Sequence, residues 1–145
     1  MNNLTIAQGL LNDDRFVQEI NKSGVGLVGT GLIPNSSNPD SPFADVRVRQ
    51  AMCYAIDSDA LVNAFGYGLL QTTNQWAAPG AVTYNPDVKG YPYNPEKAKE
   101  LLAEAGYPDG FDTVMNTDAG NKDMFTAAAN MLAEVGIRAK VVGKK

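Results

Sequence analysis

The sequence has 145 residues, of which 44% are hydrophobic and 19% are charged, and this composition predicts a folded domain with its own core. The formal net charge is −4, and no stretch gathers lysine and arginine, which argues against a nucleic-acid-binding surface. No apolar run approaches the roughly 20 residues that a membrane-spanning helix needs. The chain has no histidine, which excludes Ser-His-Asp and Cys-His catalysis and zinc bound through histidine.

The N-terminal part of the sequence predicts short helices followed by one extended segment. Residues 4–22 carry apolar positions at helical spacing, broken by glycine and by an Asn-Asp-Asp cluster, and predict one or two short helices. Residues 24–33 (GVGLVGTGLI) are apolar and glycine-rich, and they predict a strand that can share a sheet with later strands. Residues 34–42 are rich in proline, asparagine and serine, and predict turns.

Two helices are predicted over the next segment. Asp45 is a favourable N-cap, and apolar residues then recur at helical spacing up to residue 56. Arg49 lies four residues after Asp45, in the order that favours an ion pair along a helix. Ser58 predicts the cap of a second, shorter helix, and Gly66 predicts its end.

The C-terminal part predicts a β-α-β unit that follows an irregular segment and a helix. Residues 69–93 lack a clean period, and long loops of this kind are often functional. A helix is predicted at residues 95–105, with Asn94 as its cap and Gly106 as its end. The last predicted elements are a strand at 111–117, a helix at 123–135 and a strand at 137–141. This order predicts parallel pairing of the two strands, and hence an α/β or α+β architecture.

One glycine-rich stretch matches a nucleotide-binding pattern without its structural context. Residues 24–29 (GVGLVG) fit G-x-G-x-x-G, which requires a strand before it and a helix N-terminus after it. Here a helical pattern precedes the glycines, and Pro34 and Pro39 follow them, so no helix begins where phosphate groups belong. We interpret these glycines as allowing close backbone packing or tight turns, and we expect no cofactor.

Cys53 and the acidic side chains are the remaining candidates for catalysis or metal binding. Cys53 is the only cysteine and lies among apolar residues of a predicted helix, so we expect a buried, inert thiol, with a reactive nucleophile as the alternative. Carboxylates at helix ends and in turns are expected to be solvated rather than to form an acid–base pair or a metal site. The acidic pairs are Asp13 with Asp14, Asp57 with Asp59, and Asp109 with Asp112.

Trp76 is the only tryptophan and lies in the irregular segment. Such a side chain either fills a gap in the core or offers a flat, amphipathic platform to a ligand. Asn74 and Gln75 precede it, and their amide groups suit recognition of a peptide backbone.

Two stretches are distinctive as motifs: residues 41–57 (SPFADVRVRQAMCYAID) and residues 91–111 (YPYNPEKAKELLAEAGYPDGF). Both closely resemble blocks of the peptide/nickel-type (family 5) extracellular solute-binding proteins of ABC transporters. The strand, helix and strand predicted after residue 111 resemble the family elements that follow these blocks. The resemblance covers residues 30–142, and residues 1–23 match the family poorly.

The resemblance implies a fold and a place within it. Members of this family have two α/β lobes of the type II periplasmic-binding-protein kind, joined by hinge strands, and are several times longer than this chain. Residues 1–145 are therefore expected to form a single domain that is part of the C-terminal lobe, with a mixed sheet and flanking helices. No part of the sequence is expected to correspond to the N-terminal lobe, and none matches the family's G-W-x-x-D motif, whose acid pairs with the ligand's amine in peptide-binding members.

The resemblance also implies a ligand site built from three segments. These are the extended stretch that runs past the cleft, the loop that faces it, and the strand whose C-terminal side points toward it. The corresponding residues here are Gly31, Leu32 and Asn35; Asn74, Gln75 and Trp76; and Asn116. The Arg-Val-Arg-Gln block at residues 47–50 is expected to cap and pack a helix instead.

The function implied by the resemblance is solute binding for an ABC importer, by part of one lobe. Oligopeptides or similar solutes are the expected ligands, and a membrane permease and the missing N-terminal lobe are the expected partners. The expected location is extracytoplasmic, in the periplasm or on a cell-surface lipoprotein, and no enzymatic activity is expected. Two alternatives stay open: an isolated α/β folding or interaction unit without a ligand, and a small hydrolase that uses carboxylates or Cys53.

Overall fold

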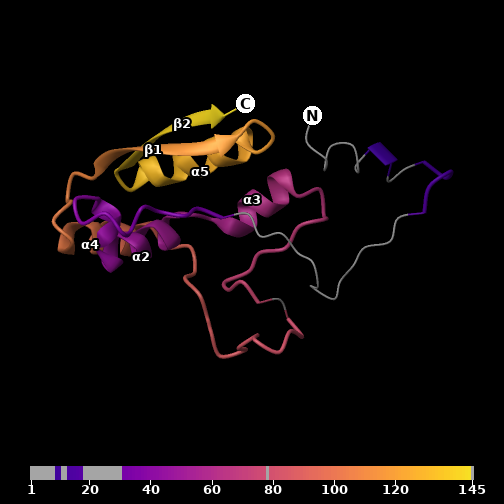
Figure 1. The fold of residues 1–145 in the computed structure, drawn as a ribbon, viewed down its shortest axis with the longest axis horizontal. Coiled ribbons are helices and arrows are strands. Elements are labelled where there is room, and N and C mark those ends of the chain that lie inside the picture. The colour runs from indigo at the N-terminus through magenta and orange to yellow at the C-terminus, as the bar shows by residue number, and fades with distance from the viewer. Residues whose placement is uncertain (1–8, 11–12, 18–30, 78, 145) are drawn as a thin grey trace.

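The computed structural model describes residues 9–10, 13–17, 31–77 and 79–144. Its elements are η1 (Pro42–Ala44), α2 (Val46–Ala55), α3 (Ser58–Phe65), α4 (Pro95–Glu104), β1 (Phe111–Asp118), α5 (Lys122–Glu134) and β2 (Ile137–Lys144). Figure 1 shows the two strands side by side with α5 along them, and α2 beside α4 in a second layer. The α/β architecture predicted from the sequence is confirmed.

The two strands form a parallel sheet in which Phe111 lies opposite Ile137. α5 provides the crossover that parallel pairing requires, as the β-α-β pattern predicts. The described residues show only this parallel pair, and the expected mixed sheet has no antiparallel strand among them. Of the strand predicted at residues 24–33, residues 31–33 form no strand in the described part of the chain, and residues 24–30 lie outside it.

Two glycines bring the starts of both strands close together. Gly110 and Gly136 have positive φ angles of 71° and 100°. A Cβ atom on Gly110 would come within 1.9 Å of the carbonyl oxygen of Gly136, and the N–H of Phe111 donates to that oxygen at 3.0 Å. Only a residue without a side chain fits at position 110, so the register of the sheet depends on this glycine.

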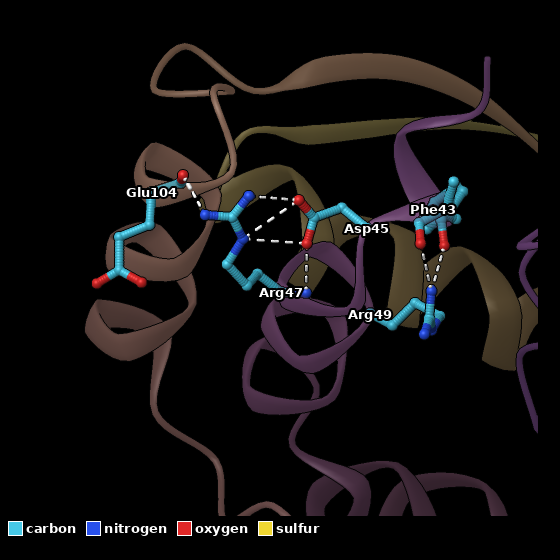
Figure 2. A network of polar contacts seen from close by, with 6 residues as sticks. Phe43, Asp45, Arg47, Arg49 and Glu104 are labelled. Atoms are coloured by element: carbon cyan, nitrogen blue, oxygen red, sulfur yellow. Dashed lines mark hydrogen bonds and ion pairs between the residues drawn. The ribbon is translucent and has the colours of Figure 1, made fainter. Parts of the chain in front are cut away.

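Helix α2 begins with the cap that the sequence predicts, but the ion pair differs. The Asp45 carboxylate accepts from the N–H of Arg47 at 2.8 Å, and Nη2 of Arg47 lies 2.5 Å from the same carboxylate. Arg49, the predicted partner, donates instead to the carbonyl oxygens of Phe43 and Ala44 (Figure 2). The cap residue lies outside helical geometry, so the four-residue spacing that pairs side chains within a helix does not apply.

Helices α3 and α4 also begin at side-chain caps. The cap of α3 is Asp57 rather than the predicted Ser58, because the Asp57 carboxylate accepts from the N–H of Ala60 at 2.9 Å. The predicted cap of α4 is confirmed, since the Asn94 side chain accepts from the N–H of Lys97 at 3.0 Å. Each cap satisfies an N–H group that has no partner inside its helix.

The core lies where α2 and α4 meet the inner side of the β-α-β unit. It is formed by Val48, Ala51, Met52, Ala55, Ala98, Leu101, Leu102, Leu132, Val135 and Ile137. Cys53 is exposed, so the prediction of a buried thiol is wrong. The buried positions of α2 define one face of the helix, and residue 53 turns away from that face although its neighbours in sequence are apolar.

The cap of α2 makes stability depend on pH. The hydrogen bonds from Arg47 lower the pKa of Asp45 from 3.8 to about 2 in the folded chain. A lowered pKa stabilises the fold above pH 3.8, and this contribution is lost as the pH falls toward 2. We expect Asp45→Asn to lower the melting temperature at neutral pH, because asparagine still caps the helix but cannot pair with Arg47.

The difference in melting temperature between Asp45→Asn and the wild type should become smaller between pH 4 and pH 2. Thermal unfolding followed by circular dichroism measures it. Asp40→Asn is the control, since it removes an exposed carboxylate that pairs with no arginine in the described residues. A difference that stays constant down to pH 2 contradicts the role of the Asp45 charge.

The glycine contact between the strands gives a second prediction. Gly110→Ala places a Cβ atom against the Gly136 carbonyl and should reduce the free energy of unfolding by about 2 kcal/mol beyond the cost of positive φ alone. Gly106→Ala measures that cost, about 1 kcal/mol, because Gly106 has a φ of 91° and no atom within 4 Å of its Cβ position. Denaturant unfolding checks both, and equal losses contradict the close contact.

Candidate solute-binding groove

A groove of about 680 Å³ runs between residues 31–43 and strand β1. Its lining residues are Gly31, Leu32, Ile33, Pro34, Asn35, Asn38, Ser41, Phe43, Met52, Thr113, Val114, Met115, Asn116, Phe125, Leu132, Ile137 and Ala139. Successive side chains of a strand point to opposite faces, yet the four consecutive residues 113–116 all line this groove. The groove therefore follows the edge of β1 that is not paired with β2, and it extends over one face of the sheet to Ile137 and Ala139 of β2.

The groove has an apolar floor and polar side chains at its border. Phe43, Met52 and Leu132 belong to the core or pack against it, and they form the apolar part. The amide side chains of Asn35 and Asn116 are exposed at its border. Asn116 lies in the C-terminal half of β1, and in open α/β sheets ligands bind outside the carboxyl ends of the strands.

The structure brings four of the expected site residues together in this groove. Gly31, Leu32 and Asn35 line one side and Asn116 lines the other. Leu32 also packs against the core, so its part in the groove is apolar contact. The amide oxygen of Asn35 accepts a weak hydrogen bond from Ser37 at 3.4 Å, which leaves most of its hydrogen-bonding capacity facing solvent.

The other three expected residues lie outside the groove, in the segment between α3 and α4. The Gln75 amide donates to the carbonyl of Asn85 at 2.9 Å and accepts from the N–H of the same residue at 3.0 Å. The Asn74 amide donates to the carbonyl of Val88 at 2.6 Å. Both amides therefore cross-link the loop internally.

Trp76 is 82% exposed, so the interpretation that it fills a gap in the core is wrong. Figure 1 shows the loop that carries it descending from α3 on the side of the helices away from the sheet. The cross-links of Asn74 and Gln75 hold the backbone on either side of this ring. Its role as a ligand platform stays a prediction.

Several groove residues were not predicted from the sequence. Ser41 falls in the run of residues 34–42 that predicts turns, and Phe43 precedes the predicted cap at Asp45. Met52 and Phe125 lie on the apolar faces of predicted helices. Asn38 falls in the turn-rich run of residues 34–42, and the available signal was its polar side chain three residues after Asn35. The edge of a strand becomes recognisable only when the pairing of the sheet is known.

The acidic pairs behave as solvated or paired surface groups. Asp112 forms an ion pair with Arg138 at 2.6 Å rather than sharing a proton with Asp109. Hydrogen bonds from Arg15 lower the pKa of the Asp13 carboxyl below its ordinary value. Within the described ranges, no group of three His, Cys, Asp or Glu side chains is arranged to hold a metal ion. No helix among these residues is long and apolar enough to cross a bilayer.

The parallel β-α-β unit with a ligand-sized groove at its edge is the architecture of an α/β binding-protein lobe. The family model for bacterial extracellular solute-binding proteins, family 5 Middle, matches residues 4–144, and the chain belongs to this family. The motif resemblance that begins at residue 30 is confirmed. The family match begins at residue 4, much earlier than the resemblance of the motifs predicts.

Two similar curated relatives are named as binding proteins. Heme-binding protein A of Haemophilus influenzae is 48% identical over 103 residues, which make up 71% of this chain and 18% of the relative. Glutathione-binding protein GsiB of Escherichia coli K12 is 38% identical over 103 residues, or 69% of this chain and 20% of the relative. The chain thus spans about a fifth of the length of these curated relatives.

A solved structure shows the same fold. The periplasmic binding protein DppA of Helicobacter pylori, in complex with the peptide STSA, matches with a TM-score of 0.70 and 32% sequence identity. The match covers 77% of this chain and 22% of that chain.

The exposed thiol gives a prediction about reactivity. Partial loss of hydration raises the pKa of the Cys53 thiol above its ordinary value of 9.0. We expect a thiol reagent to modify Cys53 without denaturant, at a rate that keeps rising as the pH increases past 9.0, because the thiolate is the reacting form. Cys53→Ser is the control for specificity. A fast reaction that is already maximal near neutral pH would indicate an activated nucleophile.

Proposed function

We propose that this chain is part of the solute-binding protein of an ABC importer and supplies one wall of its solute site. The observation that carries the proposal is the groove along β1, which combines an apolar floor with exposed amide groups near the carboxyl end of a parallel strand. Membership of the family and the binding function named for its relatives support it.

The groove chemistry favours an oligopeptide or a similar solute with amide groups. An asparagine side chain offers both a donor and an acceptor, so Asn35 and Asn116 can pair with the N–H and carbonyl groups of a peptide. The apolar floor receives side chains without demanding one specific sequence. Two ligands named for relatives, the peptide STSA and glutathione, are of this chemical kind, whereas heme, which is named for another relative, is not.

The proposed mechanism is closure of two lobes around the solute, followed by delivery to a membrane permease. The N-terminal lobe supplies the opposite wall, and the protein acts outside the cytoplasm. Enzymatic activity is not part of the proposal, because the exposed Cys53 has a raised pKa and Asp112 pairs with Arg138.

A second candidate is an α/β unit that folds alone but binds no solute. It is favoured by apolar side chains exposed beside the groove, since Ile33 is 85% and Val114 57% exposed. Surfaces of this kind are typical of a face that another part of a protein covers. In this case the groove recognises a solute only when the other lobe is present.

The test is a nitrogen–proton NMR titration of the chain with the peptide STSA, the dipeptide Met-Leu and reduced glutathione. We expect dispersed spectra with shifts concentrated at residues 31–35 and 116. Asn116→Ala should weaken binding by about three- to tenfold through loss of one or two hydrogen bonds. Asn63→Ala, on the exposed face of α3, is the matched control and should bind as the wild type does.

The outcomes separate the two candidates. Dispersed peaks that no probe moves favour the unit that folds without binding. Shifts centred on residues 74–76 instead of the groove would place the solute at Trp76 and contradict the proposed wall.

A further inference from the structure

Two arginines lie two positions apart near the start of α2, and their side chains point to different places (Figure 2). Arg47 forms an ion pair with Asp45, and its Nη1 donates to the carbonyl of Glu104 at 2.6 Å, at the end of α4. Arg49 donates through Nη1 to the carbonyls of Phe43 at 2.8 Å and Ala44 at 2.9 Å. Arg47 therefore joins two helices, whereas Arg49 holds the chain that enters α2.

The two carbonyls held by Arg49 lie at the corner between η1 and α2. Within the described residues, the N–H groups of Ala44 and Asp45 donate to the carbonyls of Ser41 and Pro42. The N–H of Arg47 donates to the carboxylate of Asp45, which caps the helix. Among the described residues, no backbone N–H outside the helices bonds to the carbonyls of Phe43 and Ala44, and the side chain of Arg49 is their donor. A guanidinium gives stronger hydrogen bonds than a neutral donor, so one cation fixes both carbonyls of the corner.

The corner also lines the groove, where Phe43 joins the wall of residues 31–43 to the apolar floor. Phe43 and Ser41 both line it, and the Ser41 hydroxyl accepts from the N–H of Phe43 at 3.3 Å. The Phe43 ring meets the Phe111 ring edge to face, with centroids 5.5 Å apart, at the start of β1. Moving the backbone at Phe43 therefore moves one wall of the groove relative to the strand that forms the other.

We propose that Arg49 is the positioning residue of the groove: it sets the width between Phe43 and β1 and thereby the affinity for the solute. Arg49 itself does not line the groove, so its effect passes through the carbonyls of Phe43 and Ala44. The effect on affinity rests on the proposed solute-binding function, whereas the effect on the position of Phe43 does not.

Arg47 supplies the matched control, because it lies on the same helix, carries the same charge and makes hydrogen bonds of similar length without touching the groove wall. Arg49→Met and Arg47→Met remove the two sets of bonds separately. Arg49→Lys tests rescue: a single nitrogen makes both bonds of Arg49, and a lysine ammonium carries three donors that can replace it in part.

The first measurement needs no ligand. In nitrogen–proton and aromatic NMR spectra, Arg49→Met should shift the resonances of the Phe43 ring and of groove residues of β1, with Asn116 among them. Arg47→Met should shift the region around Glu104 and leave the groove resonances in place. If the groove resonances shift equally in Arg49→Met and Arg47→Met, the proposal is overturned, whether or not the wild type binds a solute.

The second measurement is the affinity for whichever of STSA, Met-Leu or glutathione the wild type binds. Arg49→Met should weaken it by about tenfold, Arg49→Lys by about threefold or less, and Arg47→Met by no more than about twofold. An unchanged affinity for Arg49→Met would overturn the proposal. If the wild type binds no probe, the proposed function fails for the isolated chain, and the ligand-free spectra alone decide the role of Arg49.

Thermal unfolding checks that each variant is folded. If Arg49→Met does not fold, the comparison moves to Arg49→Lys against Arg47→Lys. The groove resonances should then shift more for Arg49→Lys than for Arg47→Lys, and equal shifts would overturn the proposal.

Discussion

The parallel pairing of β1 with β2 is the constraint on which the described structure depends. Two parallel neighbours need a crossover, which makes α5 obligatory between them and places its buried residues beneath the sheet. The close contact of Gly110 with Gly136 fixes where the pairing begins. Because β1 uses one edge for β2, its other edge is left to form the groove, so the candidate site is a direct consequence of the sheet register.

Helices α2 and α4 pack against the β-α-β unit, and the two family-like stretches contain them. α2 and α4 contribute most of the remaining core, and the Arg47 bond to the Glu104 carbonyl links the start of one helix to the end of the other. The first family-like stretch encodes the cap and this link, and the second encodes α4 and the chain that leads into β1. The contacts described for these two stretches therefore give their residues a role in packing the domain.

The sequence predicts the local features of this fold well. Caps such as Asp45 and Asn94, and stops such as Gly106, act within a few residues, so their chemistry is visible in the sequence itself. The features that the sequence does not predict depend on where a side chain points or on contacts between residues far apart in the sequence. Cys53 faces away from the core although its neighbours are apolar, and Arg47 rather than Arg49 pairs with Asp45 because the cap residue departs from helical geometry.

The candidate site shows the same division. Gly31, Leu32, Asn35 and Asn116 come together because they flank one edge of one strand, which family resemblance can indicate without knowledge of distances. Asn74 and Gln75 have the right chemistry for a ligand, but the carbonyls of Val88 and Asn85 already occupy their amides. A residue type suited to recognition is thus equally suited to holding a long loop together, and only the contacts separate the two.

The groove itself unites two requirements that differ in chemistry. Its amides lie at the border, where the proposed polar solute would be recognised, whereas Ile33 and Val114 expose apolar surface beside it. An extended peptide satisfies both, since its backbone pairs with amides while its side chains cover apolar groups. A second lobe satisfies the apolar part alone. The asparagines, which gain nothing from a purely apolar cover, are the reason to propose a solute as the occupant of the groove.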